Sequence, residues 1–227
     1  MAVALHPVRF PGESEAYRAA RDRLLEKEIE LRQGLEAVAA LRRELPLGGR
    51  VKEDYVFEQA DEDRVRSVRL SELFAPGKRS LIVYSYMYGP AAAQPCPMCT
   101  CFLDGVNAYA PHLTQRVNLV VVAKSRADRL RAWAGRRGWG RLRLLSSADN
   151  TYNTDYAAET PDGEQLPACN VFTSTDAGIF HFWSAEMLYV PTKGHPRHVD
   201  SLWPIWNFFD LTPEGRGTEW LPKLSYD

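Results

Sequence analysis

The first part of the chain alternates apolar and polar positions in a pattern that predicts one long amphipathic helix. Between Ser14 and Leu45 an apolar residue returns every seven positions, and the positions between carry mainly Arg, Glu and Lys. Ser14 is a suitable N-cap, and Pro46 ends the pattern. The repeating residues are Tyr17, Leu24, Leu31, Val38 and Leu45. This apolar stripe must pack against either the chain's own core or a second subunit. Because only one heptad position is consistently apolar, the pattern does not distinguish the two.

The rest of the chain alternates short β-branched or aromatic runs with amphipathic stretches. The expected elements, in chain order, are a connector at 68–74, a strand at 80–86, a helix at 96–115 interrupted near Pro111, a strand at 117–123, a helix at 126–137, a strand at 141–145 and a hairpin of 168–175 with 178–183. This order, β-α-β-α-β-β, predicts an α/β fold. We expect a parallel portion of sheet with helices on its faces, and an antiparallel edge from the hairpin.

Composition narrows the class of protein. The chain has 227 residues, 45% hydrophobic and 25% charged, which is typical of a folded globular domain. With 28 basic and 29 acidic residues the chain has no net positive charge to attract nucleic acid or an anionic membrane, and neither is expected as a partner. No signal-like or membrane-spanning run occurs in the sequence, so we expect a cytoplasmic protein. Four cysteines are too few for a disulfide-stapled secreted fold.

A C-x-x-C motif, Cys96-Pro97-Met98-Cys99, follows a predicted buried strand and begins a predicted helix. Cys96 falls at the N-cap, and Pro97 at the first helical position, where its missing N–H costs nothing. The free N–H groups and the helix dipole lower the pKa of a thiol at the N-cap. Cys99 lies on the same side of the first turn and can resolve a mixed disulfide. The motif predicts disulfide exchange with Cys96 attacking and Cys99 resolving.

Two other interpretations of the motif remain open. The same spacing forms half of a zinc site, and Cys101 with a histidine could complete one, although Cys101 lies about 200° around a helix from Cys99. The chain has no second C-x-x-C, so we expect no metal and no cofactor. A non-catalytic binding or dimerisation module is the other alternative. Taken singly, Cys101 and Cys169 are expected to be small buried side chains.

Several motifs occur in an order that is typical of one family. They are LLEKEIELR (24–32), LRRELP (41–46), DYVF (54–57), LSELF (70–74), LIVYSYMYGP (81–90) leading into CPMC, PHL (111–113) with Arg116, RRGW (136–139), SS (146–147) with YNTDY (152–156), Phe180-His181 and DLTPEGR (210–216). On these residues the chain resembles the bacterial thioredoxin-like family known as domain of unknown function 899, whose members are described as predicted dithiol-disulfide oxidoreductases. Phe182-Trp183-Ser184 and the loop 89–95 depart from the usual family pattern.

The resemblance implies a thioredoxin-like mixed central sheet flanked by helices. We expect residues 50–185 to form this core, residues 1–49 a helical extension, and residues 186–227 a C-terminal extension that packs on the core. The aromatic run from Trp203 to Phe209 is expected to be core or a subunit contact. Because both extensions are apolar, a homodimer is also expected.

Substrate contacts are expected beside the thiols. Pro167 precedes the hairpin strand, as the cis-proline of a thioredoxin fold does, and with Ala168 and Pro97 it is expected to meet an extended substrate. An ordinary trans proline is the alternative. The strand at 80–86 has no carboxylate, so Asp155 and Asp104 are the candidates for a proton relay, and Asp155 could instead bind backbone in a turn.

The expected substrate is a thiol or disulfide, either of a protein or of a small molecule. Residues 124–143 contain eight basic residues and one acid, which is typical of a solvated helix face or of a patch for an acidic partner or an anionic thiol. The histidines His112 and His181 are expected to be packed side chains. His195 and His198 form only a weak metal signal.

Overall fold

The N-terminal part of the chain forms one long helix, as its periodicity predicts. The computed structural model describes residues 5–61, 64–190 and 202–226, and the chain divides into two compact units, Met1–Pro46 and Leu47–Asp227. In the first unit α1 spans Glu15–Arg43, with Ser14 as N-cap accepting a hydrogen bond from the N–H of Tyr17 (3.1 Å). Arg42 and Arg43 in the last turn complement the helix dipole. No residue of α1 is buried.

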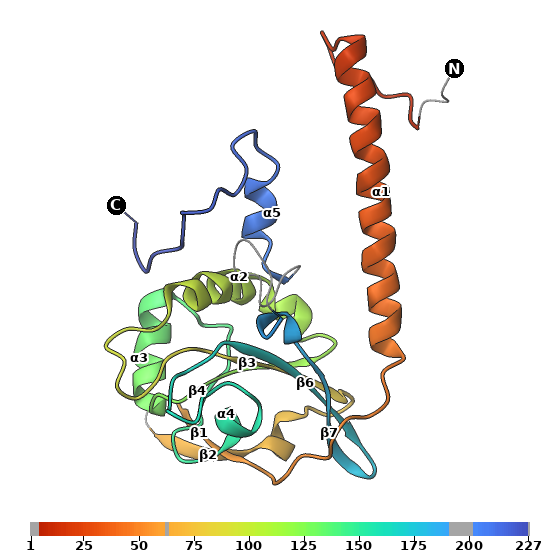
Figure 1. Cartoon of the computed structure of the whole chain (residues 1–227). Helices are drawn as coiled ribbons and strands as arrows, with labels where there is room; N and C mark the ends of the chain where they lie inside the picture. The colour runs from red at the N-terminus through yellow and green to blue at the C-terminus, as the bar shows by residue number, and fades with distance from the viewer. Residues whose placement is uncertain (1–4, 62–63, 191–201, 227) are drawn as a thin grey trace. The chain divides into compact units, whose positions relative to one another are not determined.

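The second unit is built on a seven-stranded sheet with the order β2-β1-β5-β4-β3-β6-β7 (Figure 1). Strands β3, β4 and β5 run parallel, β6 is antiparallel to β3, and β7 is antiparallel to β6. The strands are β1 Val56–Ala60, β2 Val65–Arg69, β3 Ser80–Ser85, β4 Asn118–Ala123, β5 Leu144–Ser146, β6 Ala168–Thr175 and β7 Gly178–Ser184.

Two helices connect strands where the sequence predicts them, α2 Pro97–Leu113 and α3 Ala127–Arg137. The short helices α4 Tyr152–Asp155 and α5 Ile205–Phe209 are not among the predicted elements, and short 3-10 turns occur at η1 Leu70–Leu73 and η2 Glu186–Leu188. The expected interruption of α2 at Pro111 is wrong, because the helix continues to Leu113. Pro111 lies in the last turn of the helix, where the loss of one N–H disturbs little of the hydrogen-bond ladder.

The hairpin of β1 and β2 is absent from the elements that the sequence predicts. Residues 68–74, expected as a connector, are instead the end of β2 followed by η1. Each strand of the hairpin buries one side chain fully, Phe57 in β1 and Val68 in β2. With so few buried positions, the alternation of apolar and polar residues is too short to identify a strand.

Two hydrophobic cores lie on the two faces of the sheet. The first joins residues of β3, β4 and β6 to residues of α2, α3 and α5, and it includes Tyr84, Cys99 and Cys169. The second includes Leu81 and Val83 of β3 and extends to β1, β2, η1 and α4. Because successive side chains of a strand point to opposite faces, β3 contributes to both cores.

These connections give the thioredoxin-like fold that the sequence predicts. The unit β3-α2-β4 is parallel, and the β6–β7 hairpin pairs with β3 on its other side. The C-terminal aromatic run contributes to the first core through Trp203 and Trp206, and the ring of Trp203 lies 6.0 Å from that of Phe102 in α2. His195 and His198 lie outside the described residues. None of the described helices is both long and apolar enough to span a membrane.

Replacing Trp206 by Ala tests this C-terminal packing. Trp206 is 3% exposed, and its ring contacts Trp203 (5.3 Å between centroids) and Trp220 (5.6 Å). Trp206→Ala should lower the free energy of unfolding by about 3–5 kcal/mol, because it leaves a large cavity. Phe208→Ala, in the same helix but 66% exposed, should change it by less than about 0.5 kcal/mol. Urea denaturation measures both values, and equal losses would contradict the packing.

Candidate active site

The C-x-x-C motif lies at the N-terminus of α2, beside the carboxyl end of β3. Cys96 is the N-cap and Pro97 the first helical residue, as the sequence predicts. The N–H of Cys96 donates to the carbonyl of Met87 (3.0 Å), and the N–H of Thr100 donates to the carbonyl of Cys96 (3.0 Å). The backbone of Cys96 is therefore held on both sides, while its thiol is partly exposed.

The Cys96 thiol ionises readily. Its pKa is lowered to about 6, mainly because the thiol of Cys99 donates a hydrogen bond to the Cys96 sulfur. Burial opposes this shift, and the backbone N–H groups of Cys99 and Met98 add to it. The sulfur makes no regular cap hydrogen bond, so the helix terminus acts through nearby N–H dipoles. Near neutral pH Cys96 is mostly a thiolate, which is the nucleophilic form.

Cys99 has the opposite environment. Its side chain is 1% exposed, and burial raises its pKa well above the usual range. The hydrogen bond and the charge of Cys96 raise it further, whereas a hydrogen bond from the Tyr84 side chain lowers it. One turn of helix thus holds a partly exposed thiolate and a buried protonated thiol in contact.

Tyr84 is a site residue that the sequence interpretation missed. It lies in β3, is 2% exposed, and its hydroxyl bonds the Cys99 thiol. The ring packs on Phe102 of α2 (4.8 Å between centroids), and in the antiparallel pairing of β3 and β6 Tyr84 lies opposite Cys169. Strand β3 carries no carboxylate, the group that the sequence interpretation expects in a proton relay. Alternation along β3, which places Tyr84 on the face that α2 covers, could have identified a phenol instead.

The two proposed relay carboxylates have other partners. Asp104 in α2 accepts hydrogen bonds from Arg137 Nε (3.3 Å) and Trp139 Nε1 (2.8 Å). Asp155 accepts from Tyr55 Oη (2.9 Å), and Tyr55 belongs to the core on the sheet face opposite Cys99. The structure therefore gives Asp104 and Asp155 bonding partners outside the dithiol.

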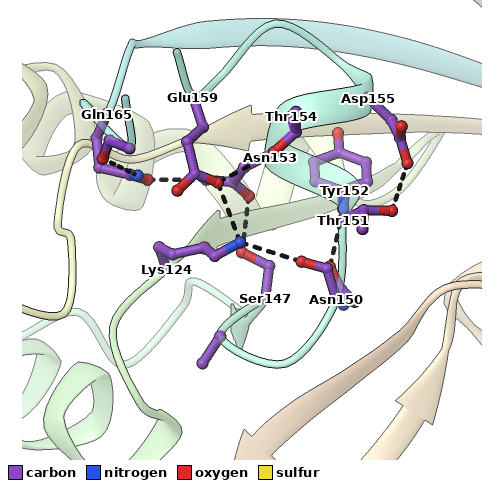
Figure 2. Close-up of polar contacts among 12 residues, drawn as sticks. Lys124, Ser147, Asn150, Thr151, Tyr152, Asn153, Thr154, Asp155, Glu159 and Gln165 are labelled. Carbon is purple, nitrogen blue, oxygen red and sulfur yellow. Dashed lines mark hydrogen bonds and ion pairs between the residues drawn. The ribbon is translucent and has the colours of Figure 1, made fainter. Parts of the chain in front are cut away.

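Side chains rather than backbone hold Asp155. Besides Tyr55, Lys52 Nζ (3.2 Å) and Thr151 Oγ1 (2.5 Å) donate to its carboxylate, and Figure 2 shows the bond from Thr151. Burial opposes ionisation of Asp155, but the hydrogen bonds from Thr151, Tyr55 and Lys52 outweigh it and lower the pKa. The carboxylate is therefore ionised near neutral pH and is bound by three donors.

Strand β6 begins at Ala168, directly after Pro167, beside the end of β3. Ala168 pairs with Ser85, the last residue of β3, and is buried. The expected cis-proline is wrong, because no peptide bond among the described residues is cis, including the bond before Pro167. Trans is the lower-energy form even before proline.

Arg129 anchors the loop that leads into the motif. This residue of α3 donates to the carbonyl oxygens of Gly89 (3.4 Å), Pro90 (3.0 Å) and Ala92. Its guanidinium carbon also lies 4.4 Å from the centroid of the Tyr88 ring. One member of the basic stretch 124–143 therefore positions the loop, which charge counting alone did not indicate.

A polar network supports the same loop from the other side. Lys124, directly after β4, forms an ion pair with Glu159 (3.0 Å) and donates to the carbonyl of Asn150 (3.1 Å), as Figure 2 shows. A side chain at Gly89 would meet Gln165 Cγ at 3.1 Å, so the network contacts the loop closely. The network contains three further hydrogen bonds. Ser147 Oγ donates to Asn153 Oδ1 (2.7 Å), Asn153 Nδ2 donates to Gln165 Oε1 (3.0 Å), and Thr154 Oγ1 donates to Glu159 Oε2 (3.3 Å).

The two remaining cysteines lie in packed positions. Cys169 of β6 is 3% exposed, and burial raises its pKa to about 12. Cys101 of α2 is partly exposed, and burial raises its pKa while a hydrogen bond with Trp203 lowers it. Within the part of the chain that the structure describes, no group of three or more His, Cys, Asp or Glu side chains is arranged to hold a metal ion.

Comparison with known proteins identifies one family and several similar folds. The family described as "Bacterial protein of unknown function (DUF899)" matches residues 7–226, and no curated protein matches. AhpC of Enterococcus faecalis is 15% identical, with a TM-score of 0.43 over 56% of this chain and 74% of that one. Reduced Prx3 of Vibrio vulnificus, in complex with hydrogen peroxide, is 14% identical, with a TM-score of 0.46 over 62% and 83%. The reduced 2-Cys peroxiredoxin of Plasmodium vivax is 17% identical, with a TM-score of 0.45 over 59% and 81%.

The pH dependence of alkylation tests the environment of Cys96. The rate at which iodoacetamide modifies Cys96 should depend on pH with an apparent pKa of about 6. Mass spectrometry of the peptide that contains Cys96 measures this rate. In Cys99→Ala the donor to the sulfur is gone, so the pKa should rise toward the ordinary thiol value of about 8.5. Cys101→Ala should leave it unchanged. A wild-type pKa already at the ordinary value is the outcome that excludes this environment.

Proposed function

The chain belongs to the DUF899 family of bacterial proteins, and we propose that it is a thiol-disulfide oxidoreductase whose working pair is Cys96 and Cys99. One observation supports this proposal above the others. A partly exposed thiol with a lowered pKa receives a hydrogen bond from a buried thiol one helical turn away. A nucleophile and a resolving thiol need this difference in protonation.

The proposed reaction is disulfide exchange in two steps. The Cys96 thiolate attacks one sulfur of a substrate disulfide, forms a mixed disulfide, and releases the other substrate sulfur as a thiolate, which takes up a proton. Cys99 then loses its proton and attacks the Cys96 sulfur, which forms the Cys96–Cys99 disulfide and releases the second substrate thiol. Two electrons pass from the protein to the substrate. A low-molecular-weight thiol or a protein dithiol reduces the pair again, as a reducing cytoplasm would supply.

Tyr84 is the positioning residue for the second step. Cys99 must become a thiolate inside an apolar core, and burial makes that unfavourable. The hydroxyl of Tyr84 lowers the pKa of Cys99, so it stabilises the charge that develops there. This role replaces the one that a carboxylate was expected to fill, since Asp104 and Asp155 are bonded to other groups.

The substrate side of the site is formed by Pro97, Pro167 and Ala168. Pro97 is exposed beside Cys96, and β6 starts at Ala168 next to the end of β3. An extended segment bearing a disulfide could lie against the backbone of Pro167 while its sulfur meets Cys96. The proposed substrates are therefore disulfides of proteins or of small molecules.

Cysteine variants test the proposal directly. Wild type should reduce insulin disulfides in the presence of dithiothreitol, and Cys96→Ser should lose this activity because it removes the nucleophile. Cys99→Ser should trap mixed disulfides with the substrate, visible as a mass increase that a reductant reverses. Cys101→Ser is the matched control and should retain activity. If Cys96→Ser reduces insulin as fast as wild type, Cys96 is not the nucleophile and the proposal fails. If neither protein reduces insulin faster than dithiothreitol alone, the protein is a binding module rather than a dithiol enzyme.

Tyr84→Phe tests the second step separately. With dithiobis-nitrobenzoate, attack by Cys96 releases one chromophore and resolution by Cys99 releases a second. Loss of a hydrogen bond to a developing thiolate should slow the second release about tenfold and leave the first within about twofold. Tyr86→Phe is the control, because the Tyr86 hydroxyl contacts Thr100 Oγ1 (2.7 Å). Equal second-phase rates in Tyr84→Phe and Tyr86→Phe would show that the phenol has no part in resolution.

A further inference from the structure

A pocket of about 520 Å³ lies where the end of α4, the β6–β7 hairpin and the residues after η2 meet. Its wall includes His181, which contacts Phe172 of the second core (5.5 Å between ring centroids). The pocket is therefore on the sheet face opposite Cys99. Segments that carry the family resemblance, YNTDY and Phe180-His181, contribute to this wall, and the proposed thiol chemistry does not use them.

The hydrogen bonds of His181 define which ring nitrogen carries a proton. Asn170 is 2% exposed, and its Nδ2 donates to the carbonyl of Tyr156 (3.4 Å). Its Oδ1 therefore faces His181 Nε2 (3.0 Å), and Nε2 must be the donor. Burial lowers the pKa of His181, although Glu186 opposes the shift, so the ring is mainly neutral at neutral pH. Nδ1 then carries a lone pair and is able to accept a hydrogen bond.

Two carboxylates and one guanidinium group belong to residues that line the pocket, those of Asp155, Glu186 and Arg50. Lys52 pairs with Asp155. Glu186 lines the pocket together with His181 and Tyr189, and after burial it is the next influence on the pKa of both groups, which it raises. No ion pair or hydrogen bond involves the Glu186 side chain among the described residues. Arg50 also lines the pocket; its backbone forms an isolated β-bridge with Phe180, and its guanidinium group lies beside Gly178.

Aromatic rings complete the wall. Tyr156 stacks on His181 with 5.7 Å between centroids and an interplanar angle of 26°. Tyr189 Oη donates to the carbonyl of Ala157 (3.2 Å), which ties the residues after η2 to the end of α4. Ala157 has a φ of 56°, a conformation that costs energy for a residue with a side chain and that clusters at ligand sites.

We propose that this pocket binds a small organic cation with a primary ammonium group. The Glu186 carboxylate supplies the opposite charge, His181 Nδ1 and the Ser184 hydroxyl supply neutral acceptors, and the exposed ring of Tyr189 supplies a face for cation–π contact. The site is separate from the dithiol, and the proposal does not depend on the redox function.

Titration of the full chain with n-butylammonium chloride tests the site. Isothermal calorimetry should show saturable binding, and the imidazole nitrogen resonances of His181 should shift with the same saturation. n-Butanol, which lacks the charge, and butyrate, which has the opposite charge, should bind at least about tenfold more weakly. Tetramethylammonium, which has no N–H donor, should also bind more weakly.

Variants of two exposed carboxylates make the test specific. Glu186→Gln should weaken n-butylammonium binding about tenfold, because a charge-assisted hydrogen bond is lost. Asp176→Asn, at the opposite end of the β6–β7 hairpin, removes the same charge and should bind as wild type does. The proposal is overturned if wild type shows no saturable binding at millimolar concentrations, if butanol binds equally well, or if Glu186→Gln binds like Asp176→Asn.

Discussion

The lowered pKa of Cys96 depends mainly on one hydrogen bond, which the buried Cys99 donates to the sulfur of Cys96. It is the largest contribution to the lowered pKa of Cys96, ahead of the N–H groups at the start of α2. The bond also holds the proton on Cys99, which already resists ionisation because it is buried. A single turn of helix, begun by Pro97, is what brings the two sulfurs into this arrangement. The proposed order of attack and resolution follows from it.

The rest of the fold keeps that turn of helix in place. Strand β3 precedes the motif in the chain and contains Tyr84, whose hydroxyl bonds the Cys99 thiol. Arg129 holds the intervening loop from α3, and the ion pair of Lys124 with Glu159 supports the segment that contacts Gly89. These two cations belong to the stretch that looks like a charged surface in the sequence. In the structure they are positioning groups for the entry to α2.

Local signals were sufficient for much of the fold and for the motif itself. Pro97 after a predicted strand identified Cys96 as an N-cap, because both the strand pattern and the proline position are local properties. Alternation along β3 is enough to place Tyr84 on one face of the sheet. Its hydrogen bond with Cys99 depends in addition on α2 packing against that face. Asp155 is one of two carboxylates that the sequence offers as a proton relay, but it accepts a hydrogen bond from Tyr55, 100 residues earlier in the chain, which no local pattern predicts. The β1–β2 hairpin was missed because only Phe57 and Val68 are fully buried in it.

The most direct test of the proposed dithiol is an equilibrium redox titration of the full chain in glutathione buffers. Free thiols are trapped at each potential, and the peptides are mapped by mass spectrometry. The expected result is one reversible two-electron transition that joins Cys96 to Cys99, while Cys101 and Cys169 stay reduced at every potential. If Cys96 and Cys99 remain thiols at the oxidising limit, or if another pair forms first, the dithiol is not the working centre of this protein.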